Sequence, residues 1–382
     1  MSVRLVRLVL LALSPTFEAT ASGALTNGAP VVVNSDGTVS TIAEESATHN
    51  LGGHERAFFS YSHNNNMEPL DVVYCPDINK IVVFMRSGAN GYTYVSAGSV
   101  NTSNETTSWG GTATLTSNNI EDDGTGFVAT WDSNINRVVC HYKNKSNSDR
   151  GTVQLVEVSS NNTCTVGSQH VFNNDRTTYI SSAFDSSINK HIVFFGSGNS
   201  DVPRLRLASI STSSFNYGSQ IYFTSNSNEE LRDNAATFDS DNNRIILAYR
   251  YQSSSSGYVR TFTISGNTVT VNNRETFNNL TPQNIKVAYN AAEQSVVVAF
   301  NAGGNNDTGR VVSGRYNTNK TAFNFGSSII YESYAHYDRD LAYSPKSRSV
   351  LLCYQDQSIS GNRFRYLKVT IGTGTAPSTT VD

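Results

Sequence analysis

Three segments of this 382-residue chain carry an aspartate four residues before an asparagine, a spacing at which side-chain oxygens could bind a calcium ion. The segments are residues 132–136, 185–189 and 239–243. A calcium loop also needs a glycine at its bend and a later glutamate that binds with both oxygens, and no segment supplies both. Asp and Asn side chains also bond to nearby backbone amides and so close hairpins. The sequence therefore predicts hairpin turns here, and no metal site.

Other residues that could do chemistry do not form a recognisable set. There is no GxxxxGK phosphate loop, no GxSxG nucleophile turn and no HExxH zinc motif. His141 and His191 fall in segments typical of strands, where we expect packing or hydrogen bonding rather than metal ligation. We therefore predict that the protein is not an enzyme and has no catalytic residue and no cofactor.

The cysteines and the net charge exclude further classes. Cys75, Cys140, Cys164 and Cys353 form no CxxC pair and no metal-ligand spacing, so we expect four reduced, small apolar side chains. A net charge of −3 argues against nucleic-acid binding, which normally needs a basic face. We expect no membrane span either, because spanning needs about 20 mostly apolar residues.

The elements that must position these residues repeat along the chain. Six times an aromatic residue is followed by a polar turn and a β-branched run, with separations of 57, 53, 54, 51 and 54 residues. Such a period in a strand-rich sequence indicates a β-propeller. We predict an all-β, six-bladed propeller over residues 54–372, preceded by a small N-terminal β arm in residues 1–53. The six aromatics are Tyr74, Trp131, Phe184, Phe238, Tyr289 and Tyr343.

The ends of the repeat region differ from its middle. In the repeats, a glycine 17 or 20 residues before the next aromatic marks the fourth strand. Residues 373–382, at the end of the chain, are instead rich in Gly, Thr, Pro and Ser, so we predict a flexible tail without a fourth strand. Gly53 has a similar offset from Tyr74, so residues 56–61 are predicted to be an orphan fourth strand. We expect this strand to pair beside residues 365–371 and close the ring, which leaves no open edge.

The N-terminal region has its own pattern. Residues 30–33, 34–37 and 38–42 predict a strand, an Asp-Gly turn and a second strand, too short to hold a core alone. Residues 2–13 have the basic start and apolar run of a leader, with a small-residue site at 19–21. Arg7 interrupts that run and Glu18 lies close to the cut, so we expect the start to be retained, with a cleaved leader over residues 1–21 as the alternative.

One rim of the predicted propeller suits recognition. The loops that join successive blades carry aromatic and charged side chains, most densely in residues 334–339. Aromatic faces beside charged donors and acceptors suit contact with a sugar or a protein. The candidate surface-recognition residues are His63, Glu68, Tyr179, Tyr334, His336, Tyr337 and Asp338.

The repeat has the form Tyr/Phe-Asp-Ser-x-x-Asn-Lys/Arg, followed by a β-branched run. This form resembles the propeller repeats of virion appendage proteins of tailed phages, notably marine and cyanobacterial ones. Residues 22–39 are similar to the N-terminal leader of such fibre and knob proteins. The resemblance implies a virion structural or adhesion role, with assembly in the host cytoplasm. It also implies partners: other virion proteins through residues 1–50, and a host-surface glycan or protein through the propeller.

The leading hypothesis is therefore a non-enzymatic virion protein of the tail-fibre, capsid-knob or decoration type, a homo-oligomer in the assembly. A secreted carbohydrate-binding propeller is the alternative, followed by a sialidase-like glycosidase. The repeated Ser-x-Asp-x-Gly-x-Thr-Trp turn of sialidases is absent, however, and residues 35–38 come nearest. The apolar start should be buried against another chain. The predicted attachment residues are Arg4, Leu5, Arg7, Leu8, Leu10 and Leu11.

Overall fold

The computed structural model describes residues 6–8, 17–19, 21, 31–33, 38–41, 67–88, 90–101, 106–120, 126–224, 229–303, 308–320, 322–333, 339–344, 348–356 and 363–381. The chain divides into two compact units, Met1–Phe58 and Phe59–Asp382. Two short 3-10 helices, η1 (Pro76–Ile78) and η2 (Lys145–Asn147), are the only helices in the described part. Neither could cross a membrane, and no described helix is long and apolar enough to do so.

Two antiparallel strand pairs form the described part of the first unit. β1 (Val6–Leu8) pairs with β2 (Phe17–Ala19), and β3 (Val31–Val33) pairs with β4 (Val39–Thr41). The second pair confirms the two predicted strands of the N-terminal arm, and the predicted turn between them, residues 34–37, lies outside the described residues. Arg7 and Leu8 of the predicted attachment set lie in β1. The other four, Arg4, Leu5, Leu10 and Leu11, lie outside the described residues.

The second unit is a β-propeller built from antiparallel meanders, which we number as sheets in chain order. Sheet 1 contains β5 (Met67–Cys75), β6 (Lys80–Ser87), β7 (Thr93–Asn101), β8 (Thr106–Trp109) and β9 (Ala113–Thr116). Sheet 2 contains β10 (Phe127–Asp132), β11 (Arg137–Asn144), β12 (Arg150–Val158), β13 (Cys164–Val166) and the start of β14 (His170–Asp185). Sheet 3 contains the end of β14, β15 (Lys190–Ser197), β16 (Val202–Ile210), β17 (Phe215–Tyr217) and β18 (Ile221–Tyr222).

The remaining sheets continue the pattern. Sheet 4 contains β19 (Leu231–Asp239), β20 (Arg244–Tyr251), β21 (Gly257–Ser265) and β22 (Thr268–Asn278). Sheet 5 contains β23 (Pro282–Asn290), β24 (Ser295–Ala302), β25 (Thr308–Tyr316), β26 (Phe323–Phe325) and β27 (Ile329–Glu332). Sheet 6 contains β28 (Arg339–Ser344), β29 (Ser349–Asp356), β30 (Arg363–Ile371) and β31 (Thr379–Val381).

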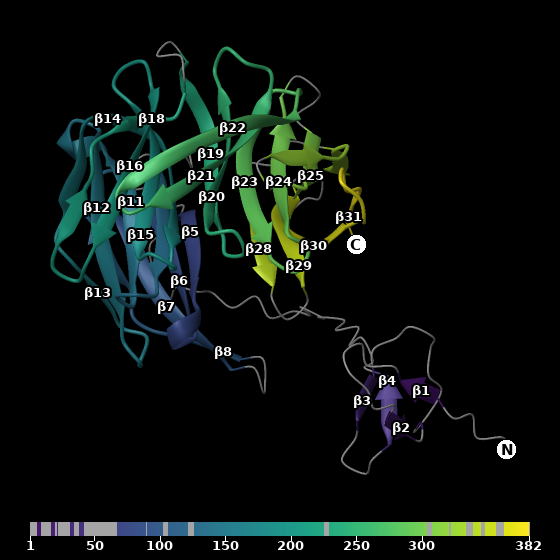
Figure 1. Cartoon of the computed structure of the whole chain (residues 1–382). Coiled ribbons are helices and arrows are strands. Elements are labelled where there is room, and N and C mark those ends of the chain that lie inside the picture. Colours follow the sequence, from purple (N-terminus) through teal and green to yellow (C-terminus); the bar gives the residue numbers. More distant parts are fainter. Residues whose placement is uncertain are drawn as a thin grey trace. The chain divides into compact units, whose positions relative to one another are not determined.

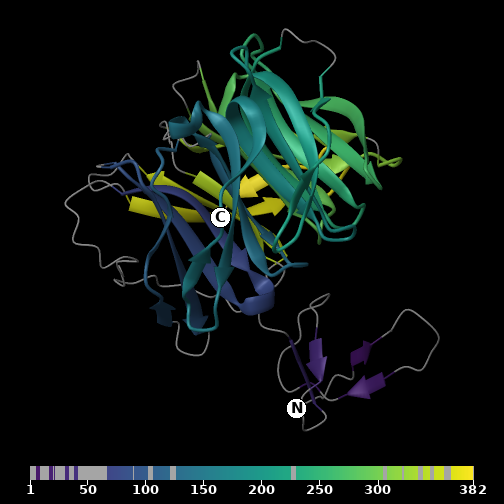
Figure 2. The same cartoon turned by 90° about the vertical axis from the view of Figure 1, so that its left-hand side faces the viewer.

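The first strand of each sheet is its inner strand, and inner strands lie side by side in chain order: β5, β10, β14, β19, β23 and β28. Figures 1 and 2 show the sheets following one another from blue (β5–β7) through teal and green to yellow (β28–β31). We call the end at which inner strands begin the upper face, and the end at which they turn into the second strand the lower face. The number of blades stays a prediction, and residues 56–61 lie outside the described part.

The second strands explain why the sheets stack. In β15, Ile192 and Phe194 pack with side chains of sheet 4, whereas Val193 and Phe195 pack with side chains of sheet 2. Each buried side chain of this kind contributes roughly 1.5–3 kcal/mol. Uniformly apolar runs are typical of strands buried on both faces, and β15 is buried along nearly its whole length.

The aspartate turns form as predicted. The Asp132 and Asp239 carboxylates each accept hydrogen bonds from two backbone amides of their own turn, and Asp185 accepts from the amide and hydroxyl of Ser187. The asparagines that end these turns have positive φ of 49° to 54°, which Asn tolerates better than most residues. Hairpin closure, not calcium binding, therefore accounts for the repeated spacing.

The C-terminus corrects the predicted tail. Residues 372–378 form a turn, and β31 then pairs with β30 as the first half of a fourth strand. The Thr379 hydroxyl accepts a 3.0 Å hydrogen bond from the Ser313 backbone amide and lies 2.7 Å from the Ser313 hydroxyl, so sheet 5 secures the strand. A segment poor in apolar residues is ordered here by contacts with a strand 66 residues earlier.

Candidate functional site

The upper face is the candidate site, because the described recognition residues lie there. Glu68 lies near the beginning of β5, and Tyr179 lies near the start of the part of β14 that belongs to sheet 3. Those two are the members of the predicted recognition set that the structure describes. Outside the described residues lie His63, Tyr334, His336, Tyr337 and Asp338.

Glu68 belongs to an ion pair within sheet 1. Its Oε2 accepts a 2.7 Å hydrogen bond from Nη1 of Arg86, a mostly buried residue on β6. The second guanidinium nitrogen of Arg86 donates to the Asn119 side chain at 3.3 Å. The Glu68 carboxylate is about half exposed, so it can meet a partner while Arg86 holds it in place.

Tyr179 is held over the neighbouring sheet. Its backbone has a positive φ of 49°, where the pairing of β14 with β15 shifts register. Its hydroxyl accepts a 2.9 Å hydrogen bond from Nη1 of Arg232 on β19, and Nη2 of the same guanidinium donates to Glu230 at 3.2 Å. Arg232 therefore links the tyrosine of sheet 3 to a carboxylate in the loop before sheet 4.

Two more arginine–tyrosine contacts lie on the same sheets. The Arg204 guanidinium lies 3.4 Å from the ring centroid of Tyr222, which is 49% exposed. The Arg274 guanidinium lies 4.5 Å from the ring centroid of Tyr258. We call this group the arginine–tyrosine rim. Its members are Tyr179, Arg204, Tyr222, Arg232, Tyr258 and Arg274, flanked by Glu229 and Glu230.

The inner strands carry a second polar group, which the sequence analysis did not identify. Asp71 Oδ2 on β5 accepts a 2.7 Å hydrogen bond from the Ala129 amide of β10. Asp233 Oδ1 on β19 accepts a 3.2 Å hydrogen bond from the Ile285 amide of β23. These carboxylates tie neighbouring inner strands together around the middle of the propeller.

Burial and the charges of neighbouring side chains shift the pKa values of these groups. Burial raises the pKa of Asp71 to about 6, although the Lys286 ammonium acts in the opposite direction, and burial likewise raises the pKa of Asp233 to about 6. Burial alone would lower the pKa of Lys286, but nearby carboxylates raise it above its ordinary value, Asp340 most strongly. Carboxyl groups with such values can exchange protons near neutral pH.

A repeat position could have revealed part of this group, Asp71 with its charged neighbours Lys286 and Asp340, but not Asp233. Asp71, Lys286 and Asp340 each lie three residues before the inner-strand aromatic of their sheet. The same position holds Val128, Ser181 and Ala235 in the other sheets. A charged residue in three of six copies of an otherwise uncharged position is a sequence signal that points to these side chains.

The remaining chemistry-bearing residues are structural. His191 Nε2 lies 2.9 Å from the Asp132 carboxylate, and His141 Nε2 lies 2.7 Å from the Tyr217 hydroxyl, with both rings fully buried. All four cysteines are free, and burial raises the pKa of the Cys164 thiol to about 11. Within the described ranges, no three His, Cys, Asp or Glu side chains are placed to hold a metal ion.

Comparisons with known proteins support the fold alone. No protein-family model matches the chain, and no curated protein matches it. A proposed 6-phosphogluconolactonase of Bacteroides uniformis has a TM-score of 0.55 at 8% identity, over 81% of this chain and 82% of that chain. A second, from Bacteroides fragilis, has 0.51 at 7% identity, over 82% and 87%. A protein from Lactobacillus plantarum has 0.51 at 12%, over 80% and 81%. At such identities, a shared propeller fold carries no activity across.

Proposed function

We propose that this protein is a non-enzymatic structural protein of a phage virion, of the tail-fibre, capsid-knob or decoration type. Residues 1–50 attach it to other virion proteins, and the propeller contacts a glycan or protein of the host surface. The resemblance of the repeat to virion appendage propellers supports this proposal, as does the division into a small β unit and a propeller. Such a protein assembles in the host cytoplasm and acts in the virion.

The arginine–tyrosine rim is the observation that carries the adhesion role. Tyr and Arg are enriched among the residues that dominate binding energy, because their planar groups bury a large area and still hydrogen-bond. Tyr222 is half exposed and backed by Arg204, and Tyr179 is fixed by Arg232. Rigid aromatic faces beside paired charges suit a sugar ring or a protein surface.

Two measurements test the two halves of this proposal. Mass spectrometry of purified phage particles should find the chain with its N-terminal residues, and its absence from particles would refute the virion role. A glycan array and a host-cell binding assay with the full chain should show binding that Tyr222→Ala weakens about tenfold or more. Tyr366→Ala is the matched control, since Tyr366 is a similarly exposed tyrosine on sheet 6. Glycan binding by a chain that is absent from particles would favour the secreted carbohydrate-binding alternative.

An enzymatic role is the second candidate, and Asp71 and Asp233 are the observation that favours it. Glycoside hydrolysis uses a pair of carboxyl groups, of which one is protonated near the working pH. A panel of chromogenic glycosides incubated with the full chain would test it. Turnover that Asp71→Asn and Asp233→Asn both abolish would replace the non-enzymatic proposal with this one.

A further inference from the structure

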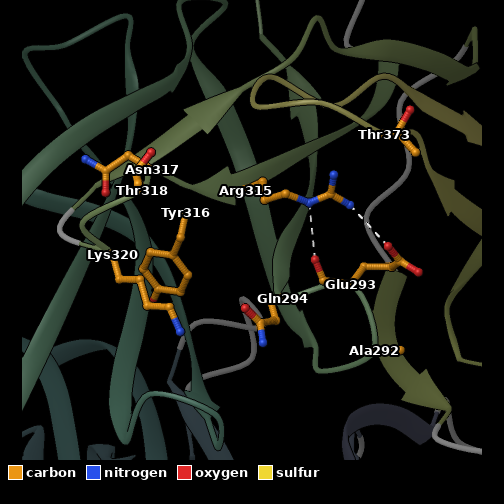
Figure 3. Close-up of a pocket in the computed structure, with 9 residues that line it drawn as sticks. All are labelled: Ala292, Glu293, Gln294, Arg315, Tyr316, Asn317, Thr318, Lys320 and Thr373. Carbon is orange, nitrogen blue, oxygen red and sulfur yellow. Dashed lines mark hydrogen bonds and ion pairs between the residues drawn. The ribbon is translucent and has the colours of Figure 1, made fainter. Parts of the chain in front are cut away.

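A cavity of about 480 Å³ opens on the lower face of sheet 5, away from the arginine–tyrosine rim. Figure 3 shows the residues that line it. One wall comes from the turn between β23 and β24, which contributes Gln294. The opposite wall comes from the last residue of β25, Tyr316, and from the turn after it, which contributes Thr318 and Lys320. Thr373, in the turn after β30 of sheet 6, completes the lining. A cavity of this size lies in the range of small-molecule sites, about 300–1,000 Å³.

The repeat explains why the cavity occurs in this sheet. In three other sheets the first residue of the second strand is basic and reaches the lower turn of the following sheet. These bonds run from Lys80 to Asn162 and the Ser160 carbonyl, from Lys190 to Asn267, and from Arg244 to the Lys320 carbonyl. In sheet 5 the same position is Ser295, whose short side chain cannot span that distance. In sheet 5 the bond to the following sheet comes instead from Arg315 of β25, which donates to the Gly374 carbonyl, so the space beneath β24 stays open.

The charges in the cavity leave one cation without an anion. Arg315 Nη2 lies 3.2 Å from the Glu293 carboxylate, which balances the charge of the guanidinium. Its Nε donates to the Glu293 carbonyl and its Nη1 to the Gly374 carbonyl, so the guanidinium is already bonded within the protein. The Lys320 ammonium has no partner among the described residues. Its side chain is exposed at the edge of the cavity, opposite the Gln294 amide (Figure 3). The cavity thus carries a net positive charge.

One wall of the cavity is rigid and aromatic. The Tyr316 hydroxyl donates a 2.7 Å hydrogen bond to the buried Asp239 carboxylate. Its ring stacks on Phe323 with the centroids 4.1 Å apart. The ring is therefore held in position before any ligand binds, which lowers the entropic cost of binding.

We propose that this cavity binds an acidic sugar, a hexuronate residue, with its carboxylate on the Lys320 ammonium. Amide and hydroxyl groups both donate and accept hydrogen bonds, so Gln294, Thr318 and Thr373 match the hydroxyl groups of a sugar ring. Arginine is the residue suited to bidentate recognition of a phosphate, and Arg315 is already bonded, whereas a single lysine ammonium matches the one charge of a carboxylate. The site lies on the opposite face from the rim and is independent of the proposed adhesion role.

Isothermal titration of the full chain with glucuronate and with glucose tests the proposal. Glucuronate should bind saturably, and glucose should bind at least about tenfold more weakly because it lacks the charge. Lys320→Gln should remove this preference and leave glucose binding unchanged. Lys368→Gln is the matched control, because Lys368 is an exposed lysine on β30 outside the cavity.

Two outcomes would overturn the site. One is the absence of saturable glucuronate binding at millimolar concentrations. The other is an unchanged affinity for glucuronate in Lys320→Gln. Thr318→Trp gives a second reading that does not depend on charge, since a bulky side chain at the exposed lining should block both sugars while circular dichroism shows an intact fold.

Discussion

Single residues tie neighbouring sheets together through the inner-strand aromatics. The Trp131 indole donates a 2.7 Å hydrogen bond to Asp77, and the Tyr289 hydroxyl donates a 2.7 Å hydrogen bond to Asp241. Each acceptor lies in the lower turn of the preceding sheet, three residues after that sheet's own aromatic. Two sheets have a phenylalanine in place of these aromatics, and the preceding sheet then has no carboxylate at the matching turn position. That turn position holds Asn134 in the sheet before Phe184 and Ser187 in the sheet before Phe238. In these four pairs, the hydrogen-bond donor on the aromatic side chain and the carboxylate that accepts from it therefore occur together or are both absent.

Asp233 is expected to give the protein a measurable pH dependence of stability. Folding raises the pKa of its carboxyl from 3.8 to about 6, so the folded protein binds this proton more tightly than the unfolded chain. The resulting stabilisation is present below about pH 4 and is lost as the pH rises through about 6. Asp233→Asn keeps an oxygen for the Ile285 amide and cannot ionise. Between pH 4 and 6.5, the unfolding free energy of the wild type should fall relative to that of the variant, as measured by urea denaturation.

Asp175→Asn serves as the control for this effect, because Asp175 is an exposed carboxylate on β14. Its stability should follow the wild-type profile across the same pH range. A profile of Asp233→Asn that runs parallel to the wild type would contradict the burial of the Asp233 carboxyl between β19 and β23.

At the scale of elements, glycines decide where the fourth strand of a sheet is interrupted. Gly218 separates β17 from β18, and Gly326 separates β26 from β27; each donates its backbone amide to the third strand. Sheet 4 has Asn273 in this place, and there β22 continues as one strand of 11 residues. The break thus follows the residue type at one repeat position.

Gly326→Ala is expected to destabilise the protein by about 1–3 kcal/mol, the usual cost of overpacking. A Cβ atom at this position would lie 1.9 Å from the Pro377 carbonyl oxygen, so the turn that leads into β31 would have to move. Thermal and urea unfolding of the variant would measure the loss.

Gly218→Ala is the matched control, because the nearest atom to its added Cβ is 3.5 Å away, an ordinary contact. It should change stability by less than about 1 kcal/mol. Deleting residues 373–382 should remove most of the cost of Gly326→Ala, since the two changes act on one contact. An undiminished cost in the truncated chain would show that β31 does not pack against sheet 5 in solution.

Sequence patterns predict elements that depend on near neighbours and miss those that depend on distant ones. The Asp239 turn and the run after it are local, and both were predicted. β31 is different, because its position rests on the Thr379–Ser313 contact and not on apolar residues of its own. The recognition set was predicted from loop composition, yet Arg204 and Tyr222 meet only because β16 and β18 pair, which composition does not show.

At the scale of the whole molecule, the first and last sheets expose apolar side chains. Val72 and Tyr74 on β5 are 52% and 57% exposed, and Tyr366 on β30 is 43% exposed. Asp71, next to Val72, faces β10, so Val72 and Tyr74 point away from sheet 2. The ring closure predicted for residues 56–61 would cover surfaces of this kind, and it stays a prediction.

Deleting residues 2–20 is expected to leave a folded, soluble propeller that no longer enters particles. The unit Phe59–Asp382 has its own cores, so it does not need the N-terminal residues to fold. The deleted segment contains Leu5, Leu8 and four further Val or Leu side chains before residue 11, each worth roughly 1.5–3 kcal/mol when buried. These are too few to form a core alone, so they should stabilise the protein only against another chain. Circular dichroism should show an unchanged melting temperature, and mass spectrometry of purified particles should show loss of the protein. Particles that contain the truncated chain at wild-type levels would place the attachment elsewhere, in residues 21–50 or on the propeller itself.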